Sequence, residues 1–525
     1  MLLRRFILLF GLLNACLFAA LLPLWEGFDE AFHYGYVETL WETGKLPVLG
    51  RTLLPADVAA SFRVAPLSHI VCRWIAEATP FDQWFSLPLE QQTQRRSELD
   101  RLRPGPADSS RPNYEAHHPP LAYAVLALPD RLLSRQPITA RVLVLRLVGA
   151  LLSTTLIWIG ASALGRTLQL PAPFLNAALF TVFCSEMLYA SIAHVANDWL
   201  AVGIGAMFLA ALAEFIRKPD RRSAIVAAGC LSAGLLTKAY FLVFVALAAV
   251  LMLNPRTKLR RTWPAAALVL VIAGPWYARN VALYGNVPGT HEEFDGIGVR
   301  QALAAAPHID WPATAGFLAR GSLWTGNNSF TTFSQTTLDV LLALLAVAFA
   351  GWIARHRSIE SAEWIIFAAI VLFSIAVAYA SAASFAHTHG ETAGASPWYT
   401  QALLAPVMIL AFLGLSRWKT AGALVAVCIT ALSAWILIAT WTVKLFPMYS
   451  GGSVAPMHPG SAWHWWTHDA AAHAAELSLT AITPARVLYT GLSISVVLTV
   501  LLAAATMAGV VKWPRMAAPA SCSAE

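Results

Sequence analysis

The sequence predicts an all-helical protein that crosses a membrane about twelve times. Of its 525 residues, 58% are hydrophobic and only 12% are charged, whereas a soluble globular protein carries about 25% charged residues. The mean hydropathy is +0.59. Apolar stretches recur along the chain near the length of about 20 residues that a helix needs to cross a bilayer. We therefore expect a single transmembrane domain over residues 1–525, embedded in a lipid bilayer.

Hydrophobic segments predict the spans themselves. They lie near residues 6–24, 140–164, 172–190, 197–216, 223–236, 239–254, 263–284, 336–355, 362–383, 398–416, 420–442 and 486–511. Residues 223–254 must cross out and back in two segments that are short for a full span. Short or broken helices in a membrane normally line a cavity, and Lys238 lies at the bend between these two.

Basic residues predict the orientation, because Lys and Arg are enriched in short cytoplasmic loops. Twelve crossings with both termini in the cytoplasm put one set of basic residues on the inner side of the plasma (inner) membrane. They are Arg4, Arg5, Arg166, Arg217, Lys218, Arg221, Arg222, Arg256, Lys258, Arg260, Arg261, Arg355, Arg357, Arg417, Lys419, Lys512 and Arg515. The first apolar run resembles a secretory signal, but an acidic motif follows it at once, and we expect an uncleaved helix.

This topology places four long loops outside, at 25–139, 285–335, 384–397 and 443–485. In the first and largest, residues 31–43, 66–78 and 89–102 are predicted as short helices, some lying on the membrane surface. Of the 14 histidines, only His356 falls in a predicted cytoplasmic loop. The external face is therefore the expected place of the chemistry, although external loops can simply tolerate histidine.

Composition also excludes some functions. The net charge of +7 is explained largely by the cytoplasmic loops, and no basic run interleaved with aromatics indicates nucleic-acid binding. The six cysteines are scattered without a CxxC pair, so neither a disulfide framework nor a zinc knuckle is predicted.

The stretch after the first span carries the main candidate residues. Asp29 and Glu30 are adjacent, and neighbours on a helix point about 100° apart, so the two carboxylates should not share one task. Asp29 and His33 are spaced i, i+4 and could face one another. Charges held at a membrane boundary are often functional, although a pair of solvated charges ending a helix is the simpler interpretation.

A second external motif is Glu115-Ala-His117-His118-Pro-Pro. Its carboxylate and imidazoles could hold a divalent cation, but the spacing is not diagnostic of one metal. The paired prolines also suit an ordinary helix start.

Three further motifs lie at predicted outer ends of spans. Asn197-Asp198 could bind substrate or merely cap a helix. Lys238 is well placed to bind a lipid phosphate. Arg279, in Trp-Tyr-Ala-Arg-Asn, could hold phosphate through bidentate hydrogen bonds or anchor an aromatic belt at the interface.

Other polar clusters lie in the later external loops. They could contact sugar, acceptor or metal, and they include His291, Glu292, His387, His389, Trp398 and Tyr399. The His-x-His-x-Glu pattern in the loop 384–397 is metal-like but weak without a fixed geometry. The aromatic loop that contains His458 suits sugar faces and membrane interfaces equally.

The order of these motifs resembles the polytopic GT-C glycosyltransferases, especially the branch of protein O-mannosyltransferases and aminoarabinose transferases (glycosyltransferase family 39-like). The resemblance rests on five motifs that appear in the expected order and on the expected side. They are Asp29-Glu30, Glu115-x-His-His-Pro-Pro, Asn197-Asp198, Thr237-Lys238 and Trp276-Tyr277-x-Arg279-Asn280. The chain departs from the family in having only residues 512–525 after the last predicted span, which leaves the acceptor open.

The resemblance implies a sugar donor carried on polyprenyl phosphate and transfer to a hydroxyl of a protein, lipid or glycan on the extracytoplasmic face. It implies that Asp29 is the catalytic base, that Glu30 positions a substrate, and that Lys238 and Arg279 hold the donor phosphate. An aspartate with an ordinary pKa near 4 is ionised at neutral pH, and a single displacement inverts the anomeric centre. The alternative function is a transporter or flippase of lipid-linked sugars, which predicts symmetric repeats and polar residues near mid-span.

Overall fold

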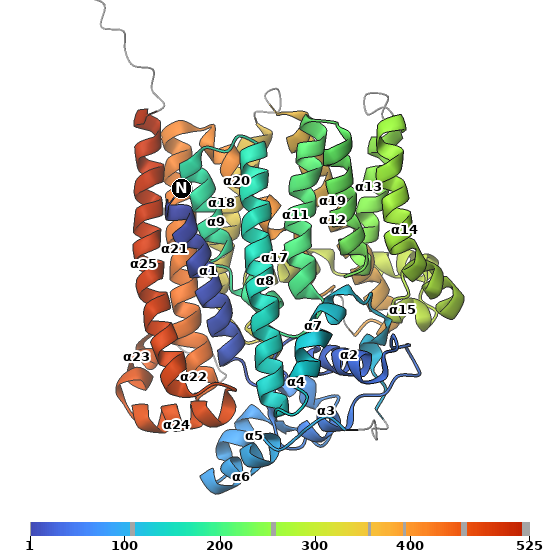
Figure 1. Ribbon diagram of the computed structural model, residues 1–525. Helices are drawn as coiled ribbons and strands as arrows, with labels where there is room; N and C mark the ends of the chain where they lie inside the picture. The colour runs from blue at the N-terminus through green and yellow to red at the C-terminus, as the bar shows by residue number, and fades with distance from the viewer. Residues whose placement is uncertain are drawn as a thin grey trace, which may run out of the picture.

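The structure is a computed structural model that describes residues 2–105, 111–253, 259–354, 359–391, 395–452 and 459–516. His356, His458 and several basic residues of the predicted cytoplasmic loops lie outside these ranges. The described chain is a helical bundle with a layer of short helices at one end (Figure 1).

Nine helices in the described ranges are long and apolar enough to cross a membrane. They are α1 (Leu2–Leu21), α8 (Ile138–Thr167), α11 (Asp198–Arg217), α14 (Leu259–Tyr284), α18 (Gln335–Ile353), α19 (Ser361–His387), η7 with α20 (Pro397–Leu403, Leu404–Ser416), α21 (Lys419–Ala439) with its extension, and α25 (Ala485–Met516). The extension of α21 is a π-helical turn, Thr440–Leu445, followed by α22 (Phe446–Met448). The all-helical, polytopic fold class is thereby confirmed.

The predicted span 172–190 is a broken helix. It consists of α9 (Ala172–Val182) and α10 (Glu186–Ile192), bent by 62°, and counts as a tenth crossing only if the pair is one span. The carboxylate of Glu186 is buried and accepts hydrogen bonds from the backbone N–H groups of Thr325 (2.8 Å) and Gly326 (3.1 Å). The bend brings this carboxylate to a loop 140 residues further along the chain, which a straight span would not reach.

The two short segments at 223–254 are short in the structure as well. They are α12 (Arg221–Leu235) and α13 (Leu242–Leu253), joined through Lys238 and the turn η2 (Ala239–Phe241). Fifteen helical residues extend about 22 Å, less than the hydrocarbon thickness of about 30 Å. Neither segment therefore counts among the nine, as the sequence predicts for these two crossings.

The layer at one end of the bundle begins with residues that follow α1. It contains α2 (Glu30–Thr43), α3 (Ala56–Ser61), α4 (His69–Cys72), α5 (Phe81–Ser86), α6 (Leu89–Leu99), the turn η1 (Tyr114–His117) and α7 (Leu121–Leu132). The predicted helices at 31–43 and 89–102 are confirmed by α2 and α6. The predicted helix at 66–78 is wrong, because the backbone of β1 (Pro66–Leu67) pairs in parallel with β2 (Thr79–Pro80) and leaves only the single turn α4 between them.

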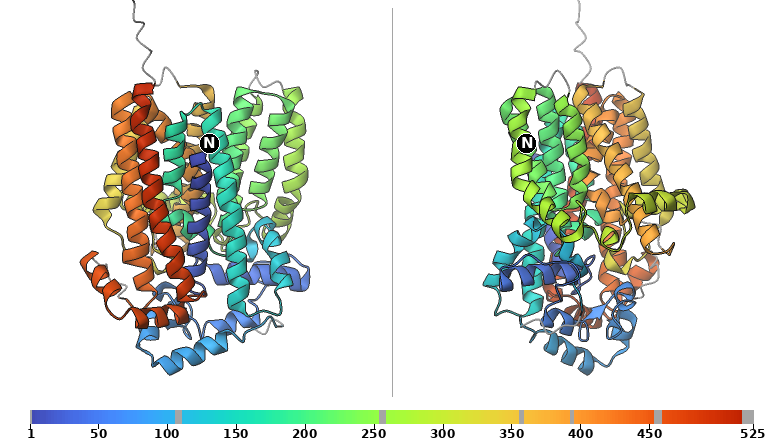
Figure 2. Two further views of the ribbon diagram at one scale, coloured as in Figure 1. Left: turned by 60° about the vertical axis from the view of Figure 1, so that its left-hand side comes forward. Right: turned by 90° about the vertical axis from the view of Figure 1, so that its right-hand side faces the viewer.

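Later loops carry further short helices. They contribute α15 (His291–Phe294), α16 (Val299–Ala305), η4 (Ala306–His308), α17 (Trp311–Gly321), η5 (Asn327–Ser329), α23 (Pro459–Thr467) and α24 (Ala470–Thr480). Figures 1 and 2 show the short helices of the first loop, with α23 and α24, at the end of the bundle opposite to the start of α1 and the end of α25, while the segment from α15 to α17 lies above them at the side of the bundle. The loops 25–139 and 443–485 thus share one side, as the sequence predicts.

Small residues allow the central helices to approach closely. A Cβ atom on Gly160 of α8 would lie 2.6 Å from a backbone atom of Ala206 in α11. Close backbone contact between helices is a common source of association in membranes, where the hydrophobic effect does not act between helices. The α8–α11 pair forms a rigid centre beneath the layer of short helices.

Candidate functional site

The site is built on the turn that leaves α1. Glu30, the first residue of α2, forms a buried ion pair with Arg146 of α8: Nε donates to Oε1 (2.7 Å) and Nη2 to Oε2 (2.5 Å). The same guanidinium donates to the carbonyls of Leu22 (2.6 Å) and Pro23 (2.8 Å). Burial alone would raise the pKa of Glu30, but the charge and hydrogen bonds of Arg146 outweigh it and lower the pKa. Both carboxylate oxygens are occupied, so Glu30 fixes the turn.

Asp29 adopts a left-handed conformation (φ 54°) in front of α2. Its Oδ1 accepts a hydrogen bond from the hydroxyl of Tyr114 at 2.6 Å. Asp29 is the residue before the helix, and the backbone N–H of His33 donates to its carbonyl at 3.1 Å. The side-chain hydrogen bond of His33 goes to the hydroxyl of Tyr123, with Nδ1 at 2.8 Å.

The environment of Asp29 changes its acidity. Burial is the largest cause that raises the pKa of Asp29 to about 7, and the negative charge of Glu115 adds to it. The hydrogen bond from Tyr114 and the positive charge of Lys238 act in the opposite direction. An aspartate with this pKa is a stronger base than an ordinary one, and it is poised to take a proton near neutral pH.

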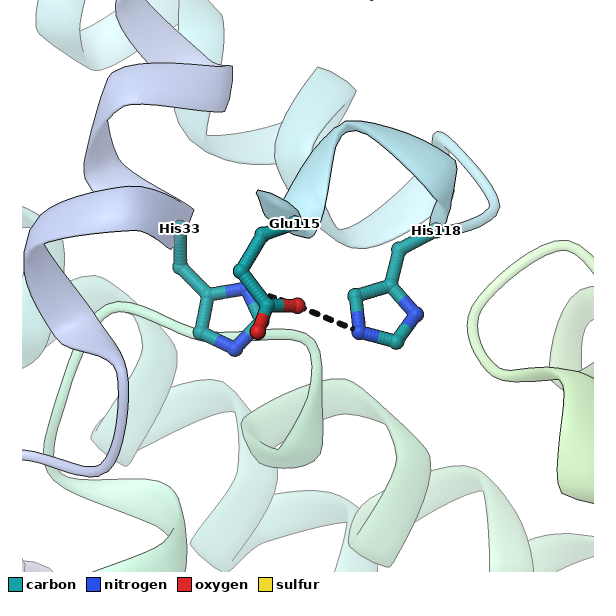
Figure 3. A group of neighbouring side chains, drawn as sticks. All are labelled: His33, Glu115 and His118. Atoms are coloured by element: carbon teal, nitrogen blue, oxygen red, sulfur yellow. Dashed lines mark ion pairs between the residues drawn. The ribbon is translucent and has the colours of Figure 1, made fainter. Parts of the chain in front are cut away.

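Glu115, His33 and His118 form an acid–imidazole cluster beside Asp29. Oε2 of Glu115 lies 2.6 Å from Nε2 of His118 and 3.7 Å from Nδ1 of His33. Figure 3 shows the carboxylate between the two rings, with His33 on α2 and the other two residues on the segment around η1. The structure thus brings together residues 82 to 85 positions apart in the sequence.

Burial lowers the basicity of the imidazoles in this region. It is the largest cause that lowers the pKa of His118 to about 3 and of His117 to about 4, and it also lowers the pKa of His33. Burial likewise raises the pKa of Glu115 to about 7. The imidazoles are therefore neutral at physiological pH.

A divalent cation is one possible occupant of this cluster. One ligand atom from each of Glu115, His33 and His118 lies within 4.8 Å of the others. However, Nδ1 of His33 is already bonded to the hydroxyl of Tyr123, and Nδ1 of His117 faces the carbonyl of Tyr114 at 2.9 Å. The cluster therefore fits a shared proton better than a metal ion.

Lys238 enters the site from the bend between α12 and η2. Its Nζ donates to Oδ1 of Asp198 at 2.5 Å, and the ammonium lies 4.6 Å from the ring centre of Tyr399. Asn197 is the residue before α11, but its side chain makes no cap hydrogen bond. Both amide atoms of Asn197 are buried without a hydrogen-bond partner, so they are available to a bound ligand.

Trp398 extends the site on the side of η7. Its ring stacks on Phe28 at 4.1 Å between centroids, with the planes 15° apart. Phe28 directly precedes Asp29, so the chain next to the carboxylate is held by this aromatic pair. Tyr399, the next residue, carries the cation–π contact with Lys238.

Arg279 takes partners different from those of Lys238. Its Nη2 donates to the carbonyl of Pro47 at 2.7 Å, and its guanidinium lies 4.7 Å from the ring centre of Trp276. Nη1 is buried without a hydrogen-bond partner. The shared phosphate site of Lys238 and Arg279 therefore stays a prediction.

Two of the remaining candidates, His291 and His387, lie in a second cluster. His291 and His387 both face Asp295, from α15 and from the end of α19 respectively. The negative charge of Glu292 is among the causes that act on the pKa of His117, so α15 lies near the first cluster. His389 has an exposed side chain and does not belong to either cluster.

Two buried arginines and one tyrosine were not predicted as important residues. Arg141 pairs with Glu38 (2.9 Å), Asp57 (3.3 Å) and Asp130 (2.8 Å), and all four side chains are buried. Arg141 and Arg146 both fall at the start of the predicted span 140–164, and a charge inside an apolar segment is a signal that could have identified them. No local pattern distinguishes Tyr114 from other tyrosines.

An apolar cavity of about 530 Å³ opens between α17, α18, α19 and α20. Leu318, Leu345, Phe373 and Leu404 are among its lining residues. The ring of Phe373 also packs 5.0 Å from the ring of Tyr240, which contacts Lys238. The rings of Phe373 and Tyr240 thus connect the lining of the cavity to the ammonium group.

The fold and this site define a polytopic helical membrane protein with a buried acid–imidazole–amine site at one end of its bundle. No family model and no curated protein matches the chain. The fold of the chain is similar to that of ArnT from Cupriavidus metallidurans, in crystal structures of the apo state and of the state bound to undecaprenyl phosphate. The sequence identity is 15% in both cases. Both overlaps cover 86% of this chain and 75% of the other, with TM-scores of 0.41 and 0.42. Similarity at this level assigns neither a family nor an activity to the chain.

Proposed function

We propose that the protein is a GT-C-type membrane glycosyltransferase that moves a sugar from a polyprenyl-phosphate donor to an acceptor hydroxyl on the extracytoplasmic face. The observation that carries the proposal is a buried carboxylate of raised pKa, Asp29, within the electrostatic reach of an ammonium group, Lys238, which is itself bonded to Asp198. Glycosyl transfer from a lipid phosphate needs a base for the acceptor and a cation for the leaving phosphate.

The chemistry is a single displacement. The acceptor oxygen attacks the anomeric carbon while Asp29 takes the hydroxyl proton. The bond between that carbon and the phosphate oxygen breaks, and the polyprenyl phosphate leaves with the electron pair near Lys238. One base suffices, so a second catalytic carboxylate as in glycosidases is not required. The anomeric configuration inverts.

The surroundings of the two groups support this assignment. A polyprenyl chain needs apolar surface, and the cavity lined by Phe373 offers it. The rings of Phe373 and Tyr240 connect this lining to Lys238. Stacked rings such as Phe28–Trp398 suit the apolar face of a sugar. Glu30 acts indirectly, because its pair with Arg146 fixes the turn that carries Asp29.

The test is transfer by the purified full-length protein in detergent, with a polyprenyl-phosphate sugar as donor and envelope extract as acceptor. We expect a glycosylated product and released polyprenyl phosphate from the parent, and neither from Asp29→Asn. In proteoliposomes, movement of the lipid-linked sugar across the bilayer without product would instead establish the flippase alternative and contradict the proposal.

A further inference from the structure

Two polar segments that lie 92 residues apart in the sequence meet at the outer end of α19. Oδ2 of Asp295 lies 2.8 Å from Nε2 of His387 and 3.3 Å from Nδ1 of His291. The two imidazole rings are nearly perpendicular, with centroids 5.2 Å apart. One nitrogen from each ring and one carboxylate oxygen thus converge on a common point.

The helical turn α15 and the end of helix α19 position the side chains of His291, Asp295 and His387. His291 and Asp295 are spaced i, i+4 on the turn α15, and the N–H of Asp295 donates to the carbonyl of His291 at 3.0 Å, so both side chains lie on one face. Thr290 caps the turn. His387 is the last residue of α19, and the left-handed residues His389 and Gly390 then turn the chain away.

Apolar packing sets the distance between the two segments. Ala302 of α16 is fully buried with Ile309 against Ala382 and Ala383 of α19. These contacts lie within one or two turns of the polar cluster, so α15 cannot move far from the end of α19 without exposing them. The three ligand atoms are therefore held in place before any ion binds.

The geometry matches a known kind of metal site. Zinc takes nitrogen and oxygen ligands at about 2.0–2.1 Å in a tetrahedron, which puts ligand atoms about 3.3 Å apart. We propose that His291, Asp295 and His387 bind a divalent cation of the zinc type, with the fourth position open. In contrast to His33 in the first cluster, neither His291 nor His387 has its inward-facing nitrogen hydrogen-bonded to a tyrosine hydroxyl.

The bound cation has a structural consequence. It ties α15 to α19 and so holds Glu292, the neighbour of His291, near His117 of the acid–imidazole cluster. The site is separate from the proposed catalytic groups, and its existence does not depend on the glycosyltransferase assignment. Its loss should loosen the segment around α15 and leave the bundle intact.

Metal binding is tested on the full-length protein in detergent, purified without a polyhistidine tag and stripped with a chelator. We expect the parent to bind one equivalent of Zn²⁺, to give the visible absorption of tetrahedral cobalt with Co²⁺, and to gain a higher melting temperature with added Zn²⁺. His387→Gln and Asp295→Asn should lose all three effects. His389→Ala, two residues away, and His118→Ala, in the other cluster, should keep them.

The melting temperature of each variant in chelator shows whether it folds, and His291→Ala provides a third variant if one of the first two does not. Unchanged Zn²⁺ stoichiometry in folded His387→Gln and Asp295→Asn would overturn the proposal. So would loss of the metal in His118→Ala alone, or a parent protein that binds no Zn²⁺.

Discussion

At the scale of single residues, the charge on Asp29 depends on its neighbours. Its pKa is raised to about 7, mainly by burial and then by Glu115, so it holds a proton more tightly than an ordinary aspartate does. The ordinary pKa near 4 that the sequence alone suggests is wrong, because the carboxylate faces Tyr114 and a second acid instead of water. A pH-dependent activity follows from this environment.

Asp29→Asn keeps the size of the side chain but cannot take a proton. We expect turnover to fall by about 10²- to 10⁴-fold, the usual contribution of general base catalysis, with donor affinity preserved. Product formation and donor binding are measured on the same preparation. Tyr114→Phe, which removes only the hydroxyl that contacts Asp29, is the matched control and should remain far more active. Parent-like turnover of Asp29→Asn would show that another group is the base.

The pH profile of kcat/KM should fall on the acid side with a midpoint near 7, because the protonated carboxyl of Asp29 cannot act as a base. Glu115→Gln removes a like charge that raises the pKa of Asp29. We therefore expect the acid limb of this variant to move to lower pH. A shift to higher pH, or no shift, would argue against the coupling between these two carboxylates.

Lys238 is predicted to bind the donor phosphate, yet it is also the partner of Asp198. Lys238→Ala leaves a buried carboxylate unpaired, so its effect alone mixes binding with stability. The double variant Lys238→Ala/Asp198→Asn removes both charges. We expect it to melt at a higher temperature than Lys238→Ala but to bind the donor as weakly. Recovery of donor affinity in the double variant would give Lys238 a purely structural role.

At the scale of elements, two buried arginines of α8 join the layer of short helices to the bundle. Arg146 binds Glu30 and the carbonyls of Leu22 and Pro23, which follow α1, while Arg141 binds carboxylates from α2, α3 and α7. A buried charge without a partner costs several kcal/mol. The layer that carries Asp29 is thereby held in one position on α8.

Arg146→Met tests this anchor. It leaves Glu30 buried and unpaired, and breaking such a pair costs about 3–5 kcal/mol. We expect a clearly lower melting temperature in detergent, partly restored in Arg146→Met/Glu30→Gln. The pair Arg320–Asp339 has similar bidentate geometry (2.7 and 3.0 Å) but is exposed. Arg320→Met should therefore change the melting temperature little, since exposed pairs contribute about 0–1 kcal/mol. Equal effects of the two single variants would contradict the anchoring role.

At the scale of the whole molecule, the short helices of the first long loop lie at one end of the bundle, and the start of α1 and the end of α25 lie at the other (Figure 1). Basic residues lie near the end of the bundle that carries the start of α1 and the end of α25, and they predict that this end faces the cytoplasm. The donor and the acceptor would then meet on the extracytoplasmic side, where α12 and α13 end short of a full span.

Cysteine labelling of intact cells tests this orientation. In a cysteine-free background, Glu90→Cys on α6 and Thr420→Cys at the start of α21 put exposed positions at opposite ends of the bundle. We expect a membrane-impermeant maleimide to label Glu90→Cys in intact cells and Thr420→Cys only after permeabilisation. The reverse pattern would invert the topology and place the site in the cytoplasm.

The sequence by itself determined the features that depend on local composition and order. Runs of apolar residues predicted where the membrane helices lie, and the two short segments around Lys238 were recognised from their length. The motifs around Asp29, Glu115 and Asp198 were found as charged residues in predicted external loops or at the outer ends of spans, and Tyr399 as an aromatic residue where a span begins. Paired prolines also predicted the start of α7, which begins at Leu121.

Only the tertiary structure decided which of these residues meet. Tyr114 faces Asp29, Asp198 neutralises Lys238, and the two outer histidines converge on Asp295 across 92 residues. The break before α10 and the pairing of β1 with β2 depend on partners far away in the sequence, which explains why the local patterns predicted continuous helices there. The raised pKa of Asp29 also depends on the tertiary structure, because the side chain is buried and placed near other charges only once the chain has folded.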